Sequence, residues 1–206
     1  MPKKGDCLIF DPKKAALLVI DVQNYFAHPE GRAYLPAGKT ALLNIFGLMD
    51  AFSAKKYPII VTRHCHNSEE SLGMMGKFYY DHIKCGEWDS ELIDELKNKI
   101  QAASAKGTNA DIIKTIQKNT YDAFWNTGLN DHLNKKNISQ LVITGCMTHL
   151  CCETTARSAF VRGFEVYFVS DATFTKSDTF HAGTLNAVAD GFGIVVNSED
   201  IKRSCI

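Results

Sequence analysis

The chain has 206 residues, of which 45% are hydrophobic, and its 23 lysines and arginines balance its 23 aspartates and glutamates. This length and composition suit one ordinary hydrophobic core, so we expect a single domain over residues 1–206. The balanced charge argues against nucleic acid or an anionic membrane surface as the partner, and no apolar run approaches the roughly 20 residues that span a bilayer.

Short apolar runs alternate with amphipathic stretches along the chain. The first run, Ala15–Val22, predicts a buried strand, and helical spacing of apolar residues predicts a helix over Gly38–Lys55. Pro58–Thr62 predicts a second strand, before a long polar segment that ends near residue 88. The remaining predictions are, in chain order, helix Ser90–Ile100 with Ser90 as its N-cap, strand Asp111–Ile116, helix Leu129–Asn134, strand Leu141–Thr144, helix Leu150–Arg162, strand Glu165–Ser170, helix Asp178–Asp190 and strand Gly193–Val196.

This alternation predicts an α/β fold of the Rossmann-like kind. Continuous apolar strands separated by helices indicate a mostly parallel sheet of about six strands with helices on both faces, a three-layer α/β/α arrangement. In such sheets the functional site lies outside the carboxyl ends of the strands. Three notable features fall near such ends: Asp21, the group His64-Cys65-His66, and the turn after Gly145.

The seven cysteines, at positions 7, 65, 85, 146, 151, 152 and 205, are odd in number and include no C-x-x-C pair. A chain of this length needs no disulfide framework, so we expect reduced thiols and a cytoplasmic protein. The polar N-terminal segment agrees, because it lacks the apolar core of a signal peptide. A zinc cluster is the alternative, but this spacing gives it little support.

Two adjacent cysteines, Cys151 and Cys152, fall in the first turn of the helix predicted after strand Leu141–Thr144. A thiol at a helix N-terminus faces unpaired N–H groups and the positive end of the helix dipole, which favours the thiolate. Successive helical residues point about 100° apart, so only one of the two faces the carboxyl edge of the sheet. Either cysteine is also explained as a small buried hydrophobic residue.

A carboxyl and an ammonium group are candidates to act with such a thiol. Asp21 lies in an apolar strand, where a buried carboxylate needs a paired charge or a catalytic role, such as general base for the thiol. Capping of a following helix is the structural alternative. Lys118 follows a predicted strand, where a lone lysine is usually a solvated surface group. Near Asp21 and Cys151, it would favour the ionised forms of both.

Three sequence motifs together resemble those of the isochorismatase-like cysteine hydrolase superfamily. This superfamily includes nicotinamidases, N-carbamoylsarcosine amidases, ureidoacrylate amidohydrolases and isochorismatases. The motifs are LLVIDVQNYF, KNTYDAFWNTGL and ITGCMTHLCCETTARSAFVRGFEVYFVSDA, in this order, and the similarity covers nearly the whole chain. Each motif alone is weak evidence for the family, whereas their order and combination are specific.

The resemblance implies a catalytic triad of Asp21, Lys118 and Cys151, with Cys151 as the nucleophile. In the family, glycine, threonine, cysteine and threonine follow the strand at fixed spacing. Gly145, Thr148, Cys151 and Thr155 fill these positions here, so the motif selects Cys151 over Cys152. The resemblance also implies a cis peptide bond between Cys146 and Met147. This bond would aim the Met147 N–H, beside that of Cys151, at an oxyanion.

Departures from the family pattern bear on cofactor and substrate. Nicotinamidases bind a divalent metal through an Asp-x-His pair and a distant histidine, whereas here His64 and His66 form the pair and no clear third ligand exists. We therefore expect no metal or other cofactor, and favour a pocket-wall role for His64 and His66 over metal binding. Phe26 matches an aromatic residue that contacts substrate in relatives, although ordinary core packing explains it equally well. Gln23 is a further candidate for substrate contact, through hydrogen bonding.

These features predict an amidohydrolase that cleaves a C–N bond of a small amide or carbamoyl compound through a thioester. Isochorismatases that cleave a vinyl ether have glycine at the place of Cys151, so the cysteine here favours C–N hydrolysis, and ether hydrolysis is the second hypothesis. A binding or scaffold protein without activity is the third. Relatives commonly associate, and the segment Met74–Trp88 is apolar enough either to line the pocket or to contact another subunit. We therefore expect a homo-oligomer, a dimer or tetramer.

Overall fold

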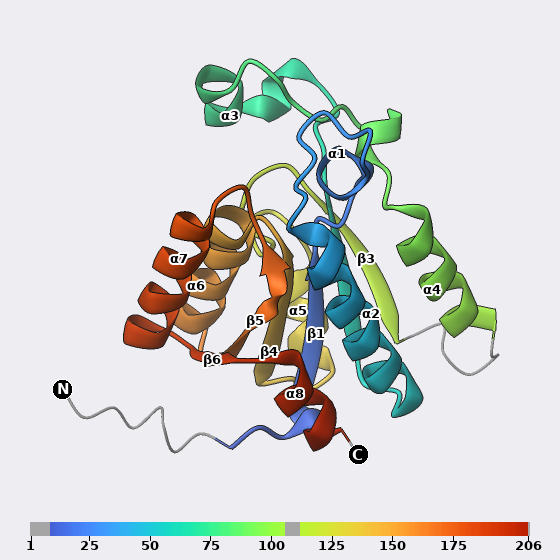
Figure 1. Cartoon of the computed structure of the whole chain (residues 1–206), viewed down its shortest axis with the longest axis vertical. Coiled ribbons are helices and arrows are strands. Elements are labelled where there is room, and N and C mark those ends of the chain that lie inside the picture. The colour runs from blue at the N-terminus through green and yellow to red at the C-terminus, as the bar shows by residue number, and fades with distance from the viewer. Residues whose placement is uncertain (1–8, 106–111, 206) are drawn as a thin grey trace.

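The computed structural model describes residues 9–105 and 112–205, and at its centre is a six-stranded sheet (Figure 1). All strand pairings are parallel, in the order β3-β2-β1-β4-β5-β6. The strands are β1 (Ala15–Ile20), β2 (Ile59–His64), β3 (Ile113–Lys118), β4 (Gln140–Cys146), β5 (Glu165–Phe174) and β6 (Ile194–Val196). The predicted parallel α/β fold is confirmed, and in this order the chain reverses its direction of winding between β1 and β4.

Helices cover both faces of the sheet, as Figure 1 shows. One layer contains α2 (Gly38–Ala54), α4 (Asp94–Ala105) and α8 (Ser198–Ser204), and the other contains α5 (Leu129–Lys135), α6 (Glu153–Val161) and α7 (Asp178–Gly191). Successive side chains of a strand point to opposite faces, so Leu17 packs in the first layer and Leu18 in the second. Among the described residues, no helix combines the length and apolarity that crossing a bilayer requires.

Short segments rise above the carboxyl ends of the strands. They are α1 (Asn24–Ala27), a 3-10 turn at Glu69–Leu72, α3 (Met74–Phe78) and a 3-10 turn at Trp88–Ser90. Figure 1 shows α1 and α3 at this end of the molecule, beyond the sheet. Residues of α1 and α3 line a cavity at this end of the molecule. Parallel sheets of this topology bind ligands outside the carboxyl ends of their strands, at the point where the winding reverses.

Two helix starts differ from the prediction. The helix expected from Ser90 begins at Asp94, because Ser90 belongs to a 3-10 turn in which its hydroxyl donates to the Glu87 carbonyl, and Leu92 bridges Gln23. The helix expected from Leu150 begins as α6 at Glu153, after a π-helical turn over Thr148–Cys152. The nucleophile candidate therefore lies in this turn and not in the first turn of an α-helix.

The expectation of reduced thiols is wrong for two cysteines, because Cys65 and Cys85 form a disulfide. The loop 66–85 returns to the end of β2, where His66 pairs with Lys84, and this brings the two Cα atoms to 5.0 Å. A sequence separation of 20 residues gave no indication of this pairing. The other described cysteines have free, buried thiols, whereas Cys7 and Asp111, the first residue of a predicted strand, lie outside the described residues.

Candidate active site

The sheet topology brings three predicted residues together. Asp21 follows β1, Lys118 ends β3, and Cys151 lies in the π-helical turn after β4. The ammonium nitrogen of Lys118 lies 2.6 Å from a carboxylate oxygen of Asp21, with both side chains fully buried, and 3.4 Å from the sulfur of Cys151. The cation thus stands between the carboxylate and the thiol.

Asp21 is held from several sides and caps no helix. The Thr62 hydroxyl donates to its second carboxylate oxygen at 2.7 Å, and the Cys146 thiol donates to its backbone carbonyl at 3.1 Å. Its φ of 52° lies in the left-handed region, which a non-glycine residue adopts only when its surroundings enforce it. The short α1 begins instead after Gln23, without a side-chain cap.

Burial and nearby charges act against each other on the pKa values of Lys118 and Cys151, with nearby charges dominant for Lys118 and burial dominant for Cys151. Burial alone would lower the pKa of the Lys118 ammonium, but the charges of Asp21 and Cys151 outweigh it and raise the pKa above its usual range. Burial raises the pKa of the Cys151 thiol to about 12, and Asp21 adds to this effect while Lys118 opposes it. Burial therefore opposes the expected thiolate, and the geometry places an Asp21–Lys118 ion pair beside the Cys151 thiol.

Two residues of the family motif, Gly145 and Thr155, fix the turn that carries Cys151. Gly145 has a φ of 105°, and a Cβ there would lie 2.1 Å from the Ile20 carbonyl oxygen, so glycine is required where β4 meets β1. The Thr155 hydroxyl accepts from the Ala123 N–H and donates to the Tyr121 carbonyl, which attaches α6 to the loop after Lys118.

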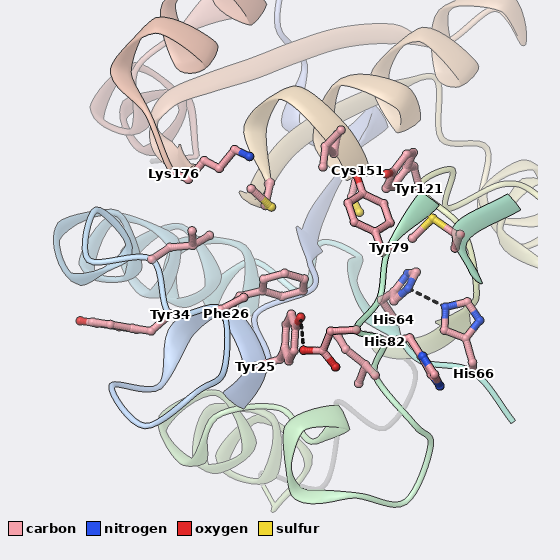
Figure 2. Close-up of a pocket in the computed structure, with 17 residues that line it drawn as sticks. Tyr25, Phe26, Tyr34, His64, His66, Tyr79, His82, Tyr121, Cys151 and Lys176 are labelled. Atoms are coloured by element: carbon pink, nitrogen blue, oxygen red, sulfur yellow. Dashed lines mark hydrogen bonds between the residues drawn. The ribbon is translucent and has the colours of Figure 1, made fainter. Parts of the chain in front are cut away.

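The Cys146–Met147 peptide bond is cis, as the resemblance implies. Met147 and Cys151 both line a cavity of about 380 Å³ that opens above the sheet. Such a volume suits a small-molecule site. Aromatic and histidine rings form a large part of the wall, together with aliphatic side chains. Tyr79 and His82 come from the segment Met74–Trp88, whereas the sequence did not single out Tyr25, Tyr34, Tyr121 and Lys176 (Figure 2).

Predicted substrate contacts divide into those that line this cavity and one that does not. Phe26, His64 and His66 contribute to its wall. Gln23 is fully buried and is not part of the wall, because its amide donates to the His64 and Ser90 carbonyls and accepts from the His64 N–H. Its predicted substrate contact is therefore replaced by a structural role, which joins β2 to the loop before α4.

His64 and His66 lie at the end of β2, where the family pattern has an Asp-x-His pair. Their Nε2 atoms lie 3.1 Å apart, within hydrogen-bond distance, and the direction of that bond depends on which ring nitrogen carries the proton. Burial, followed by the charge of Lys118, lowers the pKa of His64 to about 3, and burial also lowers that of His66. Cys65 between them is oxidised, and no three metal-binding side chains converge within residues 9–105 and 112–205.

Only some residues of the apolar segment Met74–Trp88 line the cavity. Met75, Tyr79 and Asp81 line the wall, and the Tyr79 hydroxyl hydrogen-bonds that of Tyr121 at 2.7 Å. Other members of the segment face solvent, among them Met74, Phe78 and Tyr80. The segment is thus a side wall that reaches over to the loop following β3.

Comparison with known proteins places this geometry in context. The family model described as "Isochorismatase domain" matches residues 15–200. Nicotinamidase 3 of Arabidopsis thaliana is 38% identical over 195 residues, which cover 94% of this chain and 90% of that protein.

Two solved structures share the fold. A cysteine hydrolase from Pseudomonas syringae pv. phaseolicola superimposes with a TM-score of 0.84 at 24% identity, over 95% of this chain and 94% of its own. A nicotinamidase from Bacillus subtilis gives a TM-score of 0.81 at 22% identity, over 89% and 99%.

Proposed function

The chain belongs to the isochorismatase family of hydrolases, and from this premise we propose that it is a cysteine-dependent amidohydrolase for a small amide or carbamoyl compound. The observation that carries the proposal is the contact of Lys118 with both Asp21 and Cys151, at the inner end of an aromatic cavity. The 38% identity to a nicotinamidase supports cleavage of a C–N bond.

The first step uses Asp21 as general base. Because the Cys151 thiol has a pKa of about 12, its proton moves to the Asp21 carboxylate as the sulfur attacks the substrate carbonyl carbon. Lys118 stays positively charged throughout. When the carboxylate of Asp21 takes up the proton, the negative charge appears on the substrate oxygen, so the Lys118 cation still has a negative charge nearby. The N–H groups of Met147 and Cys151 are the proposed donors to the oxyanion, where a fixed donor is worth roughly 3–4 kcal/mol.

The second half of the reaction returns the proton. The tetrahedral adduct collapses, the C–N bond breaks, and Asp21 gives its proton to the departing ammonia or amine. The acyl group remains on Cys151 as a thioester. Asp21 then takes a proton from a water that attacks this thioester, and the thiol is restored as the carboxylic acid leaves.

No step of this scheme uses a metal, and we propose a cofactor-independent enzyme because, within the described residues, no third metal-binding side chain joins His64 and His66. The two neutral imidazoles supply a polar wall, and Phe26 supplies an apolar surface against the substrate. Their arrangement around the cavity supports substrate contact for all three.

An ammonia-release screen tests the proposal. Nicotinamide, benzamide, small aliphatic carboxamides and ureides are incubated with the protein and with its Cys151→Ala and Cys152→Ala variants. We expect ammonia from at least one compound, loss of at least 10⁴-fold in kcat for Cys151→Ala, and retained activity for Cys152→Ala. Pyruvate from isochorismate without ammonia from any amide would show ether hydrolysis instead, and no turnover of either kind would indicate a scaffold.

A further inference from the structure

The Lys118 ammonium has three N–H groups but four acceptors around it. The Asp21 carboxylate at 2.6 Å and the Thr120 carbonyl at 3.0 Å are the nearer two, and each takes one N–H. The Cys151 sulfur lies at 3.4 Å and the Nδ1 atom of His64 at 3.5 Å. The third N–H is therefore shared between the thiol and an imidazole that has no part in the proposed steps.

The sheet itself fixes His64 beside Lys118. The two residues are partners in the parallel pairing of β2 with β3, and both are buried. The side-chain amide of Gln23, two residues after Asp21, accepts from the His64 N–H at 2.7 Å and donates to the His64 carbonyl at 2.9 Å. The backbone of His64 is thus tied to the segments that carry both members of the buried ion pair.

A chain of hydrogen bonds leads on from His64 to a backbone carbonyl. Its Nε2 atom lies 3.1 Å from that of His66 (Figure 2), and the Nδ1 atom of His66 lies 3.1 Å from the Ser71 carbonyl oxygen. The side-chain amide of Asn119 donates to the same oxygen at 3.2 Å. Because Asn119 directly follows Lys118, the chain of contacts returns to the segment from which it starts.

The two ends of this chain fix the direction of each bond in it. An ammonium only donates and a carbonyl only accepts, so His64 carries its proton on Nε2 and His66 carries its proton on Nδ1. The opposite tautomers would point an N–H of His64 at the ammonium and a lone pair of His66 at the Ser71 carbonyl. The Thr120 carbonyl also attracts a proton to the His64 ring, but Lys118 already donates to that carbonyl. Burial lowers the pKa of both rings, in agreement with two neutral imidazoles.

We propose that His64 is a positioning residue, whose Nδ1 lone pair holds the third N–H of Lys118 beside the Cys151 sulfur. His66 fixes the tautomer of His64 that makes this possible. The inference rests on the proposed function, which gives Lys118 and Cys151 their roles. While the sulfur is a thiol, which is a weak acceptor, the imidazole keeps the N–H bonded. When the sulfur loses its proton, the same N–H is in place to turn to it, and the cation does not have to move.

Two amide side chains at position 64 separate this role from simple packing. In His64→Asn, the side-chain oxygen can take the place of Nδ1 and accept from Lys118. In His64→Gln, the longer side chain brings its amide to the place of Nε2, so the contact with His66 can form but the ammonium loses its acceptor. His64→Leu removes both contacts. His132→Asn and His132→Gln are the matched controls, because His132 lies on α5 and does not line the cavity.

The kinetic constants of these variants are measured with the compound of the ammonia-release screen that is hydrolysed fastest. We expect kcat to fall roughly five- to tenfold in His64→Gln and in His64→Leu, and to stay within about threefold of wild type in His64→Asn. KM should change less than kcat, and the two His132 variants should match each other. Equal kcat values for His64→Asn and His64→Gln, or a loss confined to KM, would overturn the inference.

Nitrogen-15 NMR of the histidine rings tests the hydrogen-bond chain without turnover. Spectra of the wild type are assigned by the loss of signals in His64→Gln and His66→Gln. We expect the proton on Nε2 in His64 and on Nδ1 in His66. The opposite tautomers in an active amidohydrolase would overturn this inference alone, whereas the expected tautomers in a protein that releases no ammonia from any amide would overturn the proposed function.

Discussion

The ammonium nitrogen of Lys118 lies 2.6 Å from a carboxylate oxygen of Asp21, and neither side chain has any exposed surface. Removal of two charges from water costs several kcal/mol for each, so the pair persists only because each ion compensates the other. In the proposed mechanism, the same compensation lets negative charge pass from Asp21 to a sulfur or a substrate oxygen while Lys118 remains paired. Stability and chemistry therefore depend on one contact.

Removal of one partner should be far more damaging than removal of an exposed charge. Lys118→Met leaves the Asp21 carboxylate buried and unpaired, and we expect a loss of about 3–5 kcal/mol in the free energy of unfolding, measured in urea at neutral pH. Lys97→Met is the control, because Lys97 pairs with Glu91 and Asp94 at the surface and should cost at most about 1 kcal/mol. Equal losses would contradict the account. The double variant Asp21→Asn, Lys118→Met should recover part of the stability but no activity.

Alkylation of Cys151 should be slow at neutral pH. Because burial raises the pKa of its thiol to about 12, the thiolate is scarce, and the rate with iodoacetamide should rise about tenfold for each pH unit above neutrality. The folded pKa exceeds the unfolded value near 9, so the contribution of this group to stability is present below pH 9 and is lost as pH rises toward 12. Peptide mapping of the labelled protein gives the rate at Cys151. A plateau in that rate near pH 7 would contradict the burial of the thiol.

Acid should destabilise the protein through His64. Burial and Lys118 lower the pKa of His64 to about 3, whereas an unfolded histidine titrates near 6.5, so the unfolded chain binds the extra proton between these values. Stability therefore falls as pH is lowered from 6.5 toward 3. His64→Gln should reduce the slope of unfolding free energy against pH by about 1 kcal/mol per unit in this window. An unchanged slope in urea titrations at several pH values would show that His64 is charged or solvated.

Opening of the disulfide should loosen one wall of the cavity. Cys65 and Cys85 close a loop that contributes His66, Tyr79 and Asp81 to the lining. Loss of a link across about 20 residues costs roughly 3 kcal/mol, so we expect Cys85→Ser to lower the Tm and to raise KM more than it lowers kcat. Wild-type protein treated with dithiothreitol should shift in the same way, whereas Cys85→Ser should not respond. A wild-type Tm unaffected by the reductant would contradict this role.

The fold could be predicted because the apolar pattern of each short stretch of sequence indicates whether it forms a strand or a helix. Each apolar run stands where a strand occurs, and the order of strands and helices defines a parallel sheet. The boundaries were less accurate where tertiary contacts compete with the local pattern, as at Ser90, which bonds within its own turn.

The residues of the proposed triad could be located because they lie next to strand ends and inside recognisable sequence motifs. The cavity walls could be predicted only in part: Phe26, His64, His66 and the segment Met74–Trp88 were candidates, whereas most other wall residues come from loops with no periodic pattern. Lys176 and Tyr121 stand in loops where the sequence gives no hint of direction, and the Cys65–Cys85 link depends on a return of the chain that only the packed structure defines. The oligomeric state stays a prediction.

The thioester gives the most direct test of the central claim. The protein is mixed with the amide that it hydrolyses fastest, quenched in acid during steady turnover, digested, and examined by mass spectrometry. The account predicts an acyl group on the peptide that contains Cys151, in the wild type and in Cys152→Ala, and none in Cys151→Ala. An acyl group on another residue, or continued turnover by Cys151→Ala, would contradict it.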